Sequence, residues 1–183
     1  MRQYKRLRIE GATYFFTMVT YDRRKLFLGA DAVDLLTSAI ARVQQRHPFE
    51  LQAQVILPDH LHALWQLPHG DADYSMRWRL IKEAFTKAWV KCYGPANVSA
   101  SRRAKGEQAI WQRRFWEHVI RDDKDFGTHL DYIHLNPVHH GLVTAPRDWP
   151  HSTFQQWIVR GVYEPAWGSG EKPELPAWAR PFE

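Results

Sequence analysis

The order in which strand-like and helix-like segments follow one another constrains the fold of this chain more than any single residue does. Runs rich in β-branched and aromatic residues predict strands, and apolar residues spaced three and four apart predict helices. The sequence predicts strands at about 13–21, 51–57, 60–67 and 110–120, and helices at about 31–46, 75–93 and 122–137. The first six elements give the β-α-β-β-α-β order of a ferredoxin-like α+β fold, with one helix appended. We therefore expect an antiparallel sheet with helices on one face, which leaves the other face available to a ligand.

Local signals set the ends of the first predicted helix. Asp31 can cap its N-terminus, and Pro48 stops it soon after Arg46. Pro58 and Asp59 form the turn between the second and third predicted strands.

Two histidines, His60 and His62, stand one residue apart in the third predicted strand. Alternate residues of a strand point to the same face of the sheet, so both imidazoles face one side. Two neighbouring imidazoles are a natural pair of metal ligands. The alternative is a solvated strand face that carries two histidines without a metal, so the pair predicts a metal site only in combination with other residues.

Positive charge is unevenly distributed along the chain, whose formal net charge is +5. Residues 1–25 carry seven Lys or Arg against two Asp or Glu, and residues 77–114 carry ten against two. The rest of the chain is net acidic, so the two basic regions predict a directed surface for a polyanion. Ordinary solubilising charge is the alternative interpretation.

The composition narrows the class of partner and the compartment. Nine Trp, seven Tyr and nine Phe occur among the basic residues, a combination that suits stacking on unpaired bases beside phosphate contacts, although aromatic residues also build cores. Cys92 is the single cysteine, so no internal disulfide can form and an intracellular setting is favoured. We find no signal peptide and no apolar run long enough to span a membrane, and we expect a cytoplasmic protein without membrane contact.

The last predicted helix contains Tyr132 and Asn136, which are four residues apart and therefore share a helix face. A tyrosine hydroxyl can act as a nucleophile, and an asparagine carbonyl is an oxygen ligand suited to Mg²⁺ or Mn²⁺. Packed over the strand that carries His60 and His62, this helix would supply a nucleophile and a third ligand together. The alternative is a packing tyrosine, followed by an asparagine that ends the helix before Pro137.

Four stretches give the chain a specific resemblance to a known family. It resembles the HUH single-tyrosine transposases, and most closely the REP-associated tyrosine transposases of bacteria. The stretches occur in the family's order within roughly residues 1–155 and are 57–62 (LPDHLH), 111–121 (WQRRFWEHVIR), 132–143 (YIHLNPVHHGLV) and 148–152 (DWPHS). The histidine pair alone is unspecific, whereas its combination with the later Tyr-x-x-x-Asn-Pro-Val block is specific.

The resemblance implies the chemistry of the site. His60 and His62 match the paired metal ligands of the family, Tyr132 matches the nucleophile, and Asn136 occupies the position of the third ligand. That position is a glutamine in many relatives outside the REP-associated group. The implied cofactor is Mg²⁺ or Mn²⁺, and no ATP is implied. The implied reaction cleaves single-stranded DNA to a 5′-phosphotyrosine and a free 3′-OH, and the 3′-OH of another end can rejoin the strand. His134 is expected to be a packing or DNA-contact residue.

The resemblance also implies the substrate, which is single-stranded DNA with a REP-type hairpin, and a nucleoid-associated protein that acts as a monomer or homodimer. Basic residues would hold the DNA phosphates and make binding depend on salt. Those expected to do so are Arg2, Lys5, Arg6, Arg8, Arg102, Arg103, Lys105, Arg113 and Arg114. Because neighbouring residues of a strand face opposite ways, at most one of Arg113 and Arg114 should face a given DNA surface.

Two other functions remain open. A regulatory protein could keep the fold and bind REP hairpins without cleaving them, and its binding would be unaffected by chelators. A metal-dependent hydrolase could use water in place of Tyr132. A covalent DNA–protein adduct would separate both from a tyrosine transposase.

We expect residues 1–155 to form one domain and residues 156–183 to follow as a Pro- and Gly-rich tail. Its part from 164 onward has low helix and strand potential, and two Pro-Ala-Trp units place Trp167 and Trp178 there. Such apolar anchors, on a segment too rich in proline to build its own core, predict that the tail docks on the domain. Removal of the chain after about residue 163 is expected to change the cleavage rate or hairpin affinity without unfolding the domain.

Overall fold

The computed structural model describes residues 7–95, 98, 108–170, 176 and 178–179. At its centre is a sheet in the order β2-β3-β1-β4, in which each neighbouring pair of strands is antiparallel. The strands are β1 (Thr13–Val19), β2 (Glu50–Ile56), β3 (His60–Gln66) and β4 (Trp116–Val119). This strand order is that of the ferredoxin-like fold, so the predicted fold class is confirmed.

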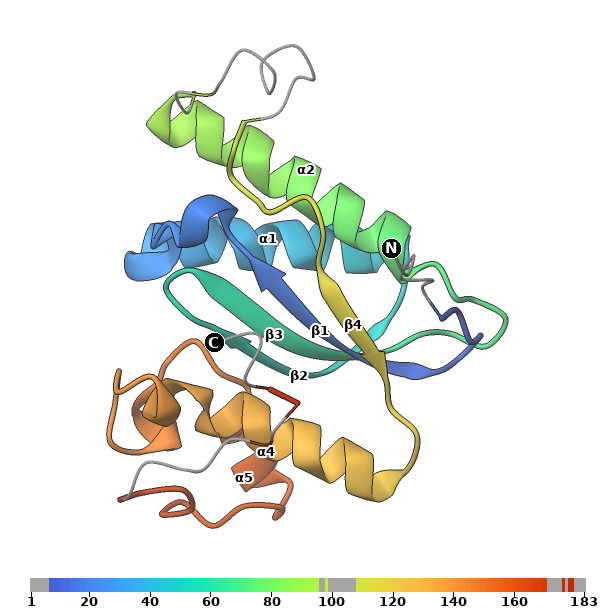
Figure 1. The fold of residues 1–183 in the computed structure, drawn as a ribbon, viewed down its shortest axis with the longest axis vertical. Coiled ribbons are helices and arrows are strands. Elements are labelled where there is room, and N and C mark those ends of the chain that lie inside the picture. The colour runs from blue at the N-terminus through green and yellow to red at the C-terminus, as the bar shows by residue number, and fades with distance from the viewer. Residues whose placement is uncertain (1–6, 96–97, 99–107, 171–175, 177, 180–183) are drawn as a thin grey trace.

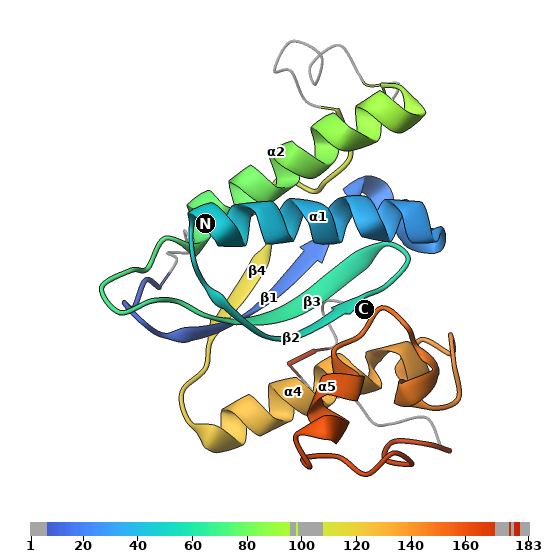
Figure 2. The same cartoon turned by 180° about the vertical axis from the view of Figure 1, so that it is seen from behind.

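Helices cover both faces of the sheet (Figure 1). On one face lie α1 (Ala30–Arg46) and α2 (Tyr74–Tyr93), and on the other lie α4 (Asp123–His139) and the short α5 (Phe154–Val159). The view from behind shows the same layers (Figure 2). The face that was expected to be available to a ligand is therefore covered by α4, the appended helix that carries Tyr132.

Alternation along β3 divides the core into two layers. Leu61 and Ala63 belong to the core against α1 and α2, whereas Leu64 belongs to the core against α4. Since alternate residues share a face, His60 and His62 lie with Leu64 on the α4 side. The two imidazoles thus point from the sheet toward the helix with the tyrosine.

Aspartates cap two of the helices. Asp73 and Asp122 directly precede α2 and α4, and each accepts a hydrogen bond from the backbone amide three residues later, at 3.0 and 2.8 Å. In contrast, α1 begins after Gly29 without a side-chain cap. The predicted cap by Asp31 is therefore wrong, because Asp31 lies inside the first turn, where its charge still complements the helix dipole.

The last strand is shorter than the predicted strand at 110–120. Trp111 opposes Thr20 in an isolated bridge, and Trp116 opposes Thr17 at the start of β4. The chain advances five residues from Trp111 to Trp116 while β1 and the residue after it span three, from Thr17 to Thr20. The two extra residues are therefore unpaired, as in a β-bulge. Arg113 and Arg114 lie in this irregular stretch, so β4 does not include them, and the expectation that at most one of them faces a given DNA surface stays a prediction.

The end of the chain bears on two further expectations. The helix α5 spans residue 155, where the first domain was expected to end, and the division into 1–155 and 156–183 stays a prediction. Among the described residues, no helix is both long and apolar enough to cross a bilayer.

Candidate active site

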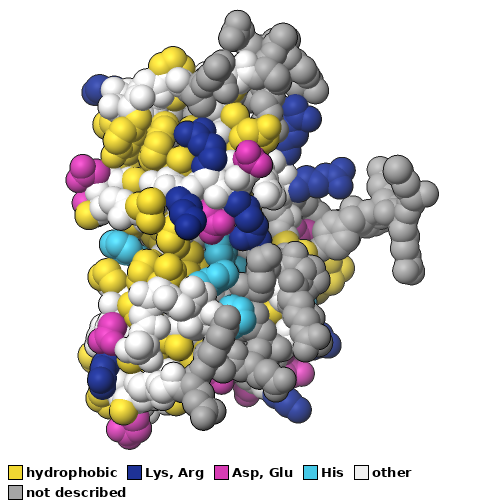
Figure 3. Space-filling model, turned by 60° about the vertical axis from the view of Figure 1, so that its left-hand side comes forward, with side chains coloured by type: hydrophobic (Ala, Val, Ile, Leu, Met, Phe, Trp, Pro, Cys, Tyr) yellow, Lys and Arg dark blue, Asp and Glu magenta, His cyan; other side chains and the backbone are white. Residues whose placement is uncertain are grey.

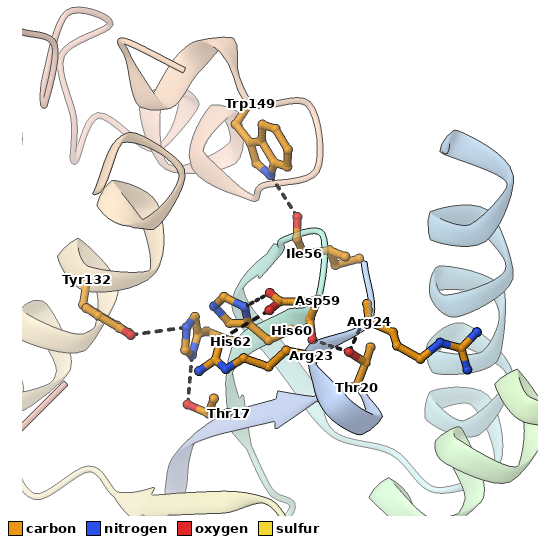
Figure 4. A network of polar contacts seen from close by, with 10 residues as sticks. All are labelled: Thr17, Thr20, Arg23, Arg24, Ile56, Asp59, His60, His62, Tyr132 and Trp149. Carbon is orange, nitrogen blue, oxygen red and sulfur yellow. Dashed lines mark hydrogen bonds and ion pairs between the residues drawn. The ribbon is translucent and has the colours of Figure 1, made fainter. Parts of the chain in front are cut away.

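His60 is oriented by the residue before it. Its Nδ1 donates a hydrogen bond to the Asp59 carboxylate at 2.6 Å (Figure 4), an arrangement that leaves Nε2 with a lone pair. This nitrogen is buried and makes no hydrogen bond to any described residue. Burial lowers the pKa of His60 below its usual value, although the hydrogen bond with Asp59 acts to raise it. The ring is therefore neutral at neutral pH.

His62 lies between a threonine and the tyrosine. Its Nδ1 is 2.9 Å from Oγ1 of Thr17, and its Nε2 is 3.3 Å from the hydroxyl of Tyr132 (Figure 4). In the tautomer that donates from Nδ1 to Thr17, Nε2 keeps its lone pair. His62 is fully buried, and this burial holds its pKa well below the usual value, with a further lowering from His60. Both histidines of the pair are thus neutral and able to bind a cation.

One face of α4 brings three polar residues to this histidine pair. Tyr132, Asn136 and His140 follow at intervals of four, so they form a stripe along the helix. Each end of the stripe contacts one histidine of the pair. The ring centroids of Tyr132 and His62 are 4.9 Å apart, and those of His140 and His60 are 5.2 Å apart. Asn136, between these ends, therefore faces the histidine pair.

The side chain of Asn136 is fully buried, and neither its amide nitrogen nor its amide oxygen has a hydrogen-bond partner among the described residues. A buried polar group without a partner costs about 1–3 kcal/mol. An amide oxygen is also a good ligand for a hard divalent cation. The buried amide and the two imidazoles therefore fit a metal ion held by Asn136, His60 and His62.

The helix does not end at Asn136, so the alternative interpretation of Asn136 as a helix stop is wrong. Although Pro137 lacks an amide hydrogen, α4 continues through it to His139, and the amide of His140 donates to the Asn136 carbonyl at 3.0 Å. Pro137 removes one backbone hydrogen bond, and the bond from His140 to Asn136 shows that the helical pattern resumes after it. The continuation keeps His140 on the stripe of Tyr132.

The expected DNA contacts are only partly described. Arg2, Lys5, Arg6, Arg102, Arg103 and Lys105 lie outside the described residues. Arg8, Arg113 and Arg114 are described and exposed. Arg113 lines a cleft beside α2, on the sheet face opposite Tyr132. The structure therefore does not bring Arg113 to the tyrosine.

Sequence reasoning missed three polar residues that support the site, namely Thr17, Arg23 and Asp59. Asp59 directly precedes the histidine pair, so an acid able to orient a metal-binding imidazole could have been recognised there. Thr17 reaches the pair only because the β1–β3 register places it opposite His62. Arg23 bonds Asp59 at 3.3 Å from a turn after β1, a contact that no local pattern indicates.

The histidine two residues after the tyrosine is a packing residue. His134 is fully buried, and its Nε2 is 3.1 Å from Oγ1 of Thr153. Burial lowers its pKa to about 3. Of the two roles expected for His134, packing is the one that this position supports.

Both tail tryptophans pack on the α4 side of the sheet. Trp167 stacks on Phe154 of the expected 1–155 domain with ring centroids 5.8 Å apart, and it also lies against Tyr163 at 4.3 Å. Trp178 stacks on His129 at 4.2 Å and meets the ring of Tyr132 at 5.0 Å. The prediction that the tail docks through these residues is confirmed, and Tyr132 is only 2% exposed.

A second group of potential metal ligands, His118, Asp125 and His129, lies where β4 meets α4, with ligand atoms within 4.8 Å of one another. The Asp125 carboxylate accepts hydrogen bonds from His118 at 2.8 Å and from the Arg121 backbone and side chain at 3.1 and 2.9 Å. Burial acts to raise the pKa of Asp125, but these hydrogen bonds hold it far below its usual value. Arg121 already compensates the negative charge of Asp125. We therefore interpret this group as a structural contact that holds β4 against α4.

Comparison with known proteins gives relatives that span nearly the whole chain. No family model matches. The chain is 43% identical over 180 residues to the REP-associated tyrosine transposase of Escherichia coli (strain K12), with 98% of each chain covered. A Haemophilus influenzae protein that carries the same family name is 44% identical over 176 residues, 96% of this chain and 97% of its own.

A solved structure resembles the chain to a similar extent. It is a REP-associated tyrosine transposase bound to a REP hairpin, and it matches with a TM-score of 0.77 and 42% sequence identity. The match covers 97% of this chain and 96% of that one. Fold and sequence therefore agree on the same group of relatives.

Proposed function

The chain belongs to the REP-associated tyrosine transposases, enzymes that act on DNA, and we propose that it cleaves and rejoins single-stranded DNA beside REP-type hairpins. The observation that carries this proposal is the 3.3 Å contact between the Tyr132 hydroxyl and His62. It joins a nucleophile to a buried set of potential metal ligands completed by His60 and Asn136. The relative bound to a REP hairpin supports the choice of substrate.

In this proposal His60, His62 and Asn136 hold Mg²⁺ or Mn²⁺, and Tyr132 is the nucleophile. The ion would orient the scissile phosphate and offset the negative charge that develops on it. The neutral state of both imidazoles supports the assignment, because a protonated imidazole cannot bind a cation. Asp59 and Thr17 would act as positioning residues, each orienting one imidazole through its Nδ1.

We take the proposed reaction from the family resemblance, with the Tyr132 hydroxyl as the attacking group. As the Tyr132 oxygen forms its bond to phosphorus, the bond from phosphorus to the 3′ oxygen breaks, which leaves a 5′-phosphotyrosine and a free 3′-OH. The phenol loses one proton and the 3′ oxygen gains one. The phosphodiester energy is retained in the phosphotyrosine, so a second 3′-OH can attack it and release Tyr132 without ATP.

A single chain supplies the whole candidate site. Tyr132 comes from α4 and meets His62 of β3 within the same molecule. We therefore propose that one protomer is sufficient for cleavage, with the tyrosine acting in cis. A protein with this substrate would work at the nucleoid.

One observation favours a second candidate function, a REP hairpin-binding regulator that does not cleave. Tyr132 is 2% exposed beneath Trp178, so a strand cannot reach the hydroxyl in this conformation. A regulator would bind hairpins equally well with and without a chelator and would form no adduct. The transposase proposal requires that Trp178 move when the strand binds.

The adduct distinguishes the candidates. An oligonucleotide with a REP-type hairpin, labelled at its 3′ end, is incubated with the protein and Mn²⁺ and resolved on a denaturing gel. We expect a labelled band at the mass of protein plus DNA, lost in Tyr132→Phe and in excess EDTA. Tyr93→Phe, which changes an exposed tyrosine of α2, is the control that should keep the band. Cleavage without any adduct would instead indicate a hydrolase that uses water.

A further inference from the structure

A cleft of about 300 Å³ opens beside His60, at the edge of the candidate site. We call it the Arg23 cleft. Its apolar lining consists of Leu57, Pro58 and Leu142, and its polar lining of Arg23, Lys25, Asp59, His60 and His140. On the face shown in Figure 3, Lys and Arg side chains lie beside an acidic side chain and next to His side chains. The cleft thus combines cations with an apolar wall, within contact of a proposed metal ligand.

The backbone that carries Arg23 is held in an unusual conformation. Asp22 and Arg23 have φ values of 56° and 46°, in the left-handed region that residues other than glycine rarely adopt. The turn is tied to the one before β3, because the backbone amide and the hydroxyl of Thr20 both donate to the Asp59 carbonyl at 2.9 Å. Such strain persists only where surrounding contacts impose it, and it occurs often at ligand sites. Here it turns the guanidinium toward the histidine pair.

The guanidinium of Arg23 bonds a carboxylate of the protein and is also exposed in the cleft. It donates to Oδ2 of Asp59 at 3.3 Å, and Oδ1 of the same carboxylate accepts from His60 (Figure 4). The Arg23 side chain is nevertheless 38% exposed, so it also reaches solvent. A guanidinium presents five donors in a planar fork, which allows it to keep a carboxylate and bind a phosphate at once.

We propose that the Arg23 cleft binds one phosphodiester of the substrate strand next to the scissile one, with Arg23 and Lys25 as the cationic contacts. This inference rests on the proposed function and adds a binding subsite to it. Asp59 carries the only negative charge among the lining residues, and Arg23 already compensates it. The apolar wall suits a deoxyribose, which has few polar groups, whereas a free inorganic anion would make no use of it. Arg23 would thereby couple the position of the strand to the orientation of His60.

The test uses single-phosphate neutralisation. A hairpin oligonucleotide is made in versions that each carry one neutral methylphosphonate linkage, and binding is measured by fluorescence anisotropy in the Tyr132→Phe background without metal. We expect one linkage near the cleavage position at which neutralisation weakens binding about 10-fold or more. In a protein that also carries Arg23→Gln, the affinity for the unmodified oligonucleotide should fall by the same factor. The methylphosphonate at that linkage should then cause no further loss of affinity. Lys25→Gln, in place of Arg23→Gln, should remove part of the sensitivity of binding to that methylphosphonate.

Arg79→Gln is the matched control, because Arg79 is an exposed arginine that also pairs with a carboxylate, Glu83 at 2.9 Å, but lies on α2. It should keep the full sensitivity to the methylphosphonate. Circular dichroism of Arg23→Gln shows whether that variant is folded, and Arg23→Lys, which retains the charge but not the planar fork, should recover part of the affinity. If Tyr132→Phe with and without Arg23→Gln were equally sensitive at every methylphosphonate linkage, the proposal would be overturned. Since the readout is binding without metal, it is independent of whether Tyr132 forms an adduct.

Discussion

The hydroxyl oxygen of Tyr132 lies 3.3 Å from Nε2 of His62, although the two residues are 70 positions apart in the chain. A neutral imidazole nitrogen has one lone pair, so Nε2 can accept the phenol proton or bind a cation, but not both at once. When a cation is bound, Tyr132 must direct its hydroxyl elsewhere, and the scissile phosphate is the group that the proposed reaction requires there. This competition links metal binding to the freedom of the nucleophile.

We predict that Tyr132→Phe abolishes cleavage and leaves hairpin affinity nearly unchanged. The substitution removes only the oxygen and keeps the ring that packs against Phe15 and Trp178. Cleavage can be followed with a 5′-labelled oligonucleotide and affinity by gel shift. A variant that still cuts at the wild-type rate would show that the nucleophile is another residue.

The hydrogen bond that His62 donates from Nδ1 to Oγ1 of Thr17 should tune metal affinity. We expect Thr17→Val, which keeps the shape of the side chain, to weaken Mn²⁺ binding by about 10- to 100-fold, as is typical when a partner of a metal-binding histidine is lost. Isothermal titration calorimetry with Mn²⁺ measures the effect without DNA. Thr37→Val, on α1, removes a hydroxyl that bonds only to its own helix and should bind Mn²⁺ normally. Identical affinities for the two variants would argue against His62 as a ligand.

The buried arginine of α2 should contribute strongly to stability. Arg77 is 2% exposed and donates to the Asp71 carboxylate at 2.6 Å and to the carbonyls of His47 and Pro48 at 3.1 and 2.7 Å. Because the Asp71 carboxylate left behind is 33% exposed, the loss comes mainly from the hydrogen bonds and packing of Arg77, and Arg77→Ala should lower the free energy of unfolding by about 1.5–3 kcal/mol. Urea denaturation measures this, with the exposed Arg79→Ala expected to change stability by less than about 1 kcal/mol.

Acid should destabilise the fold through His129. Burial lowers its pKa to about 4 from the 6.5 of an unfolded chain, despite the hydrogen bond to the Asp125 carbonyl. Between these values only the unfolded state binds the proton, so stability is full above pH 6.5 and falls as the pH drops toward 4. The slope due to one group is at most about 1.4 kcal/mol per pH unit. Denaturation series at pH 7.5, 6 and 5 should show a shallower slope for His129→Gln, and parallel slopes would contradict the assignment.

The tail should influence access to the tyrosine. Truncation after residue 170 removes Trp178, which meets the Tyr132 ring, but keeps Trp167 packed on Tyr163. We expect a changed cleavage rate with a nearly unchanged unfolding midpoint, because the packing of Trp167 on Tyr163 stays intact. The longer truncation after about residue 163 also removes Trp167 and serves as the comparison. Unchanged kinetics in both well-folded truncations would leave the tail without a role at the site.

Local patterns were sufficient for the elements whose residues carry their own periodicity. The alternation that places His60 and His62 on one face of β3, and the four-residue spacing of Tyr132 and Asn136 on α4, are properties of a few consecutive residues, and the structure has both. The roles of these residues as ligands and nucleophile stay proposals. Local patterns failed at β4, because whether a β-rich segment pairs depends on the partner strand, and Trp111 and Trp116 oppose β1 with extra residues between them.

The sequence by itself therefore determined the order of the elements and the side of each element on which the reactive groups stand. Only the tertiary structure decided what surrounds them, because contacts between residues far apart in the chain depend on register and packing. Thr17 meets His62 through the β1–β3 register, and Trp178 covers Tyr132 from a segment without periodicity of its own. Arg23 reaches Asp59 from a strained turn that long-range hydrogen bonds hold in place.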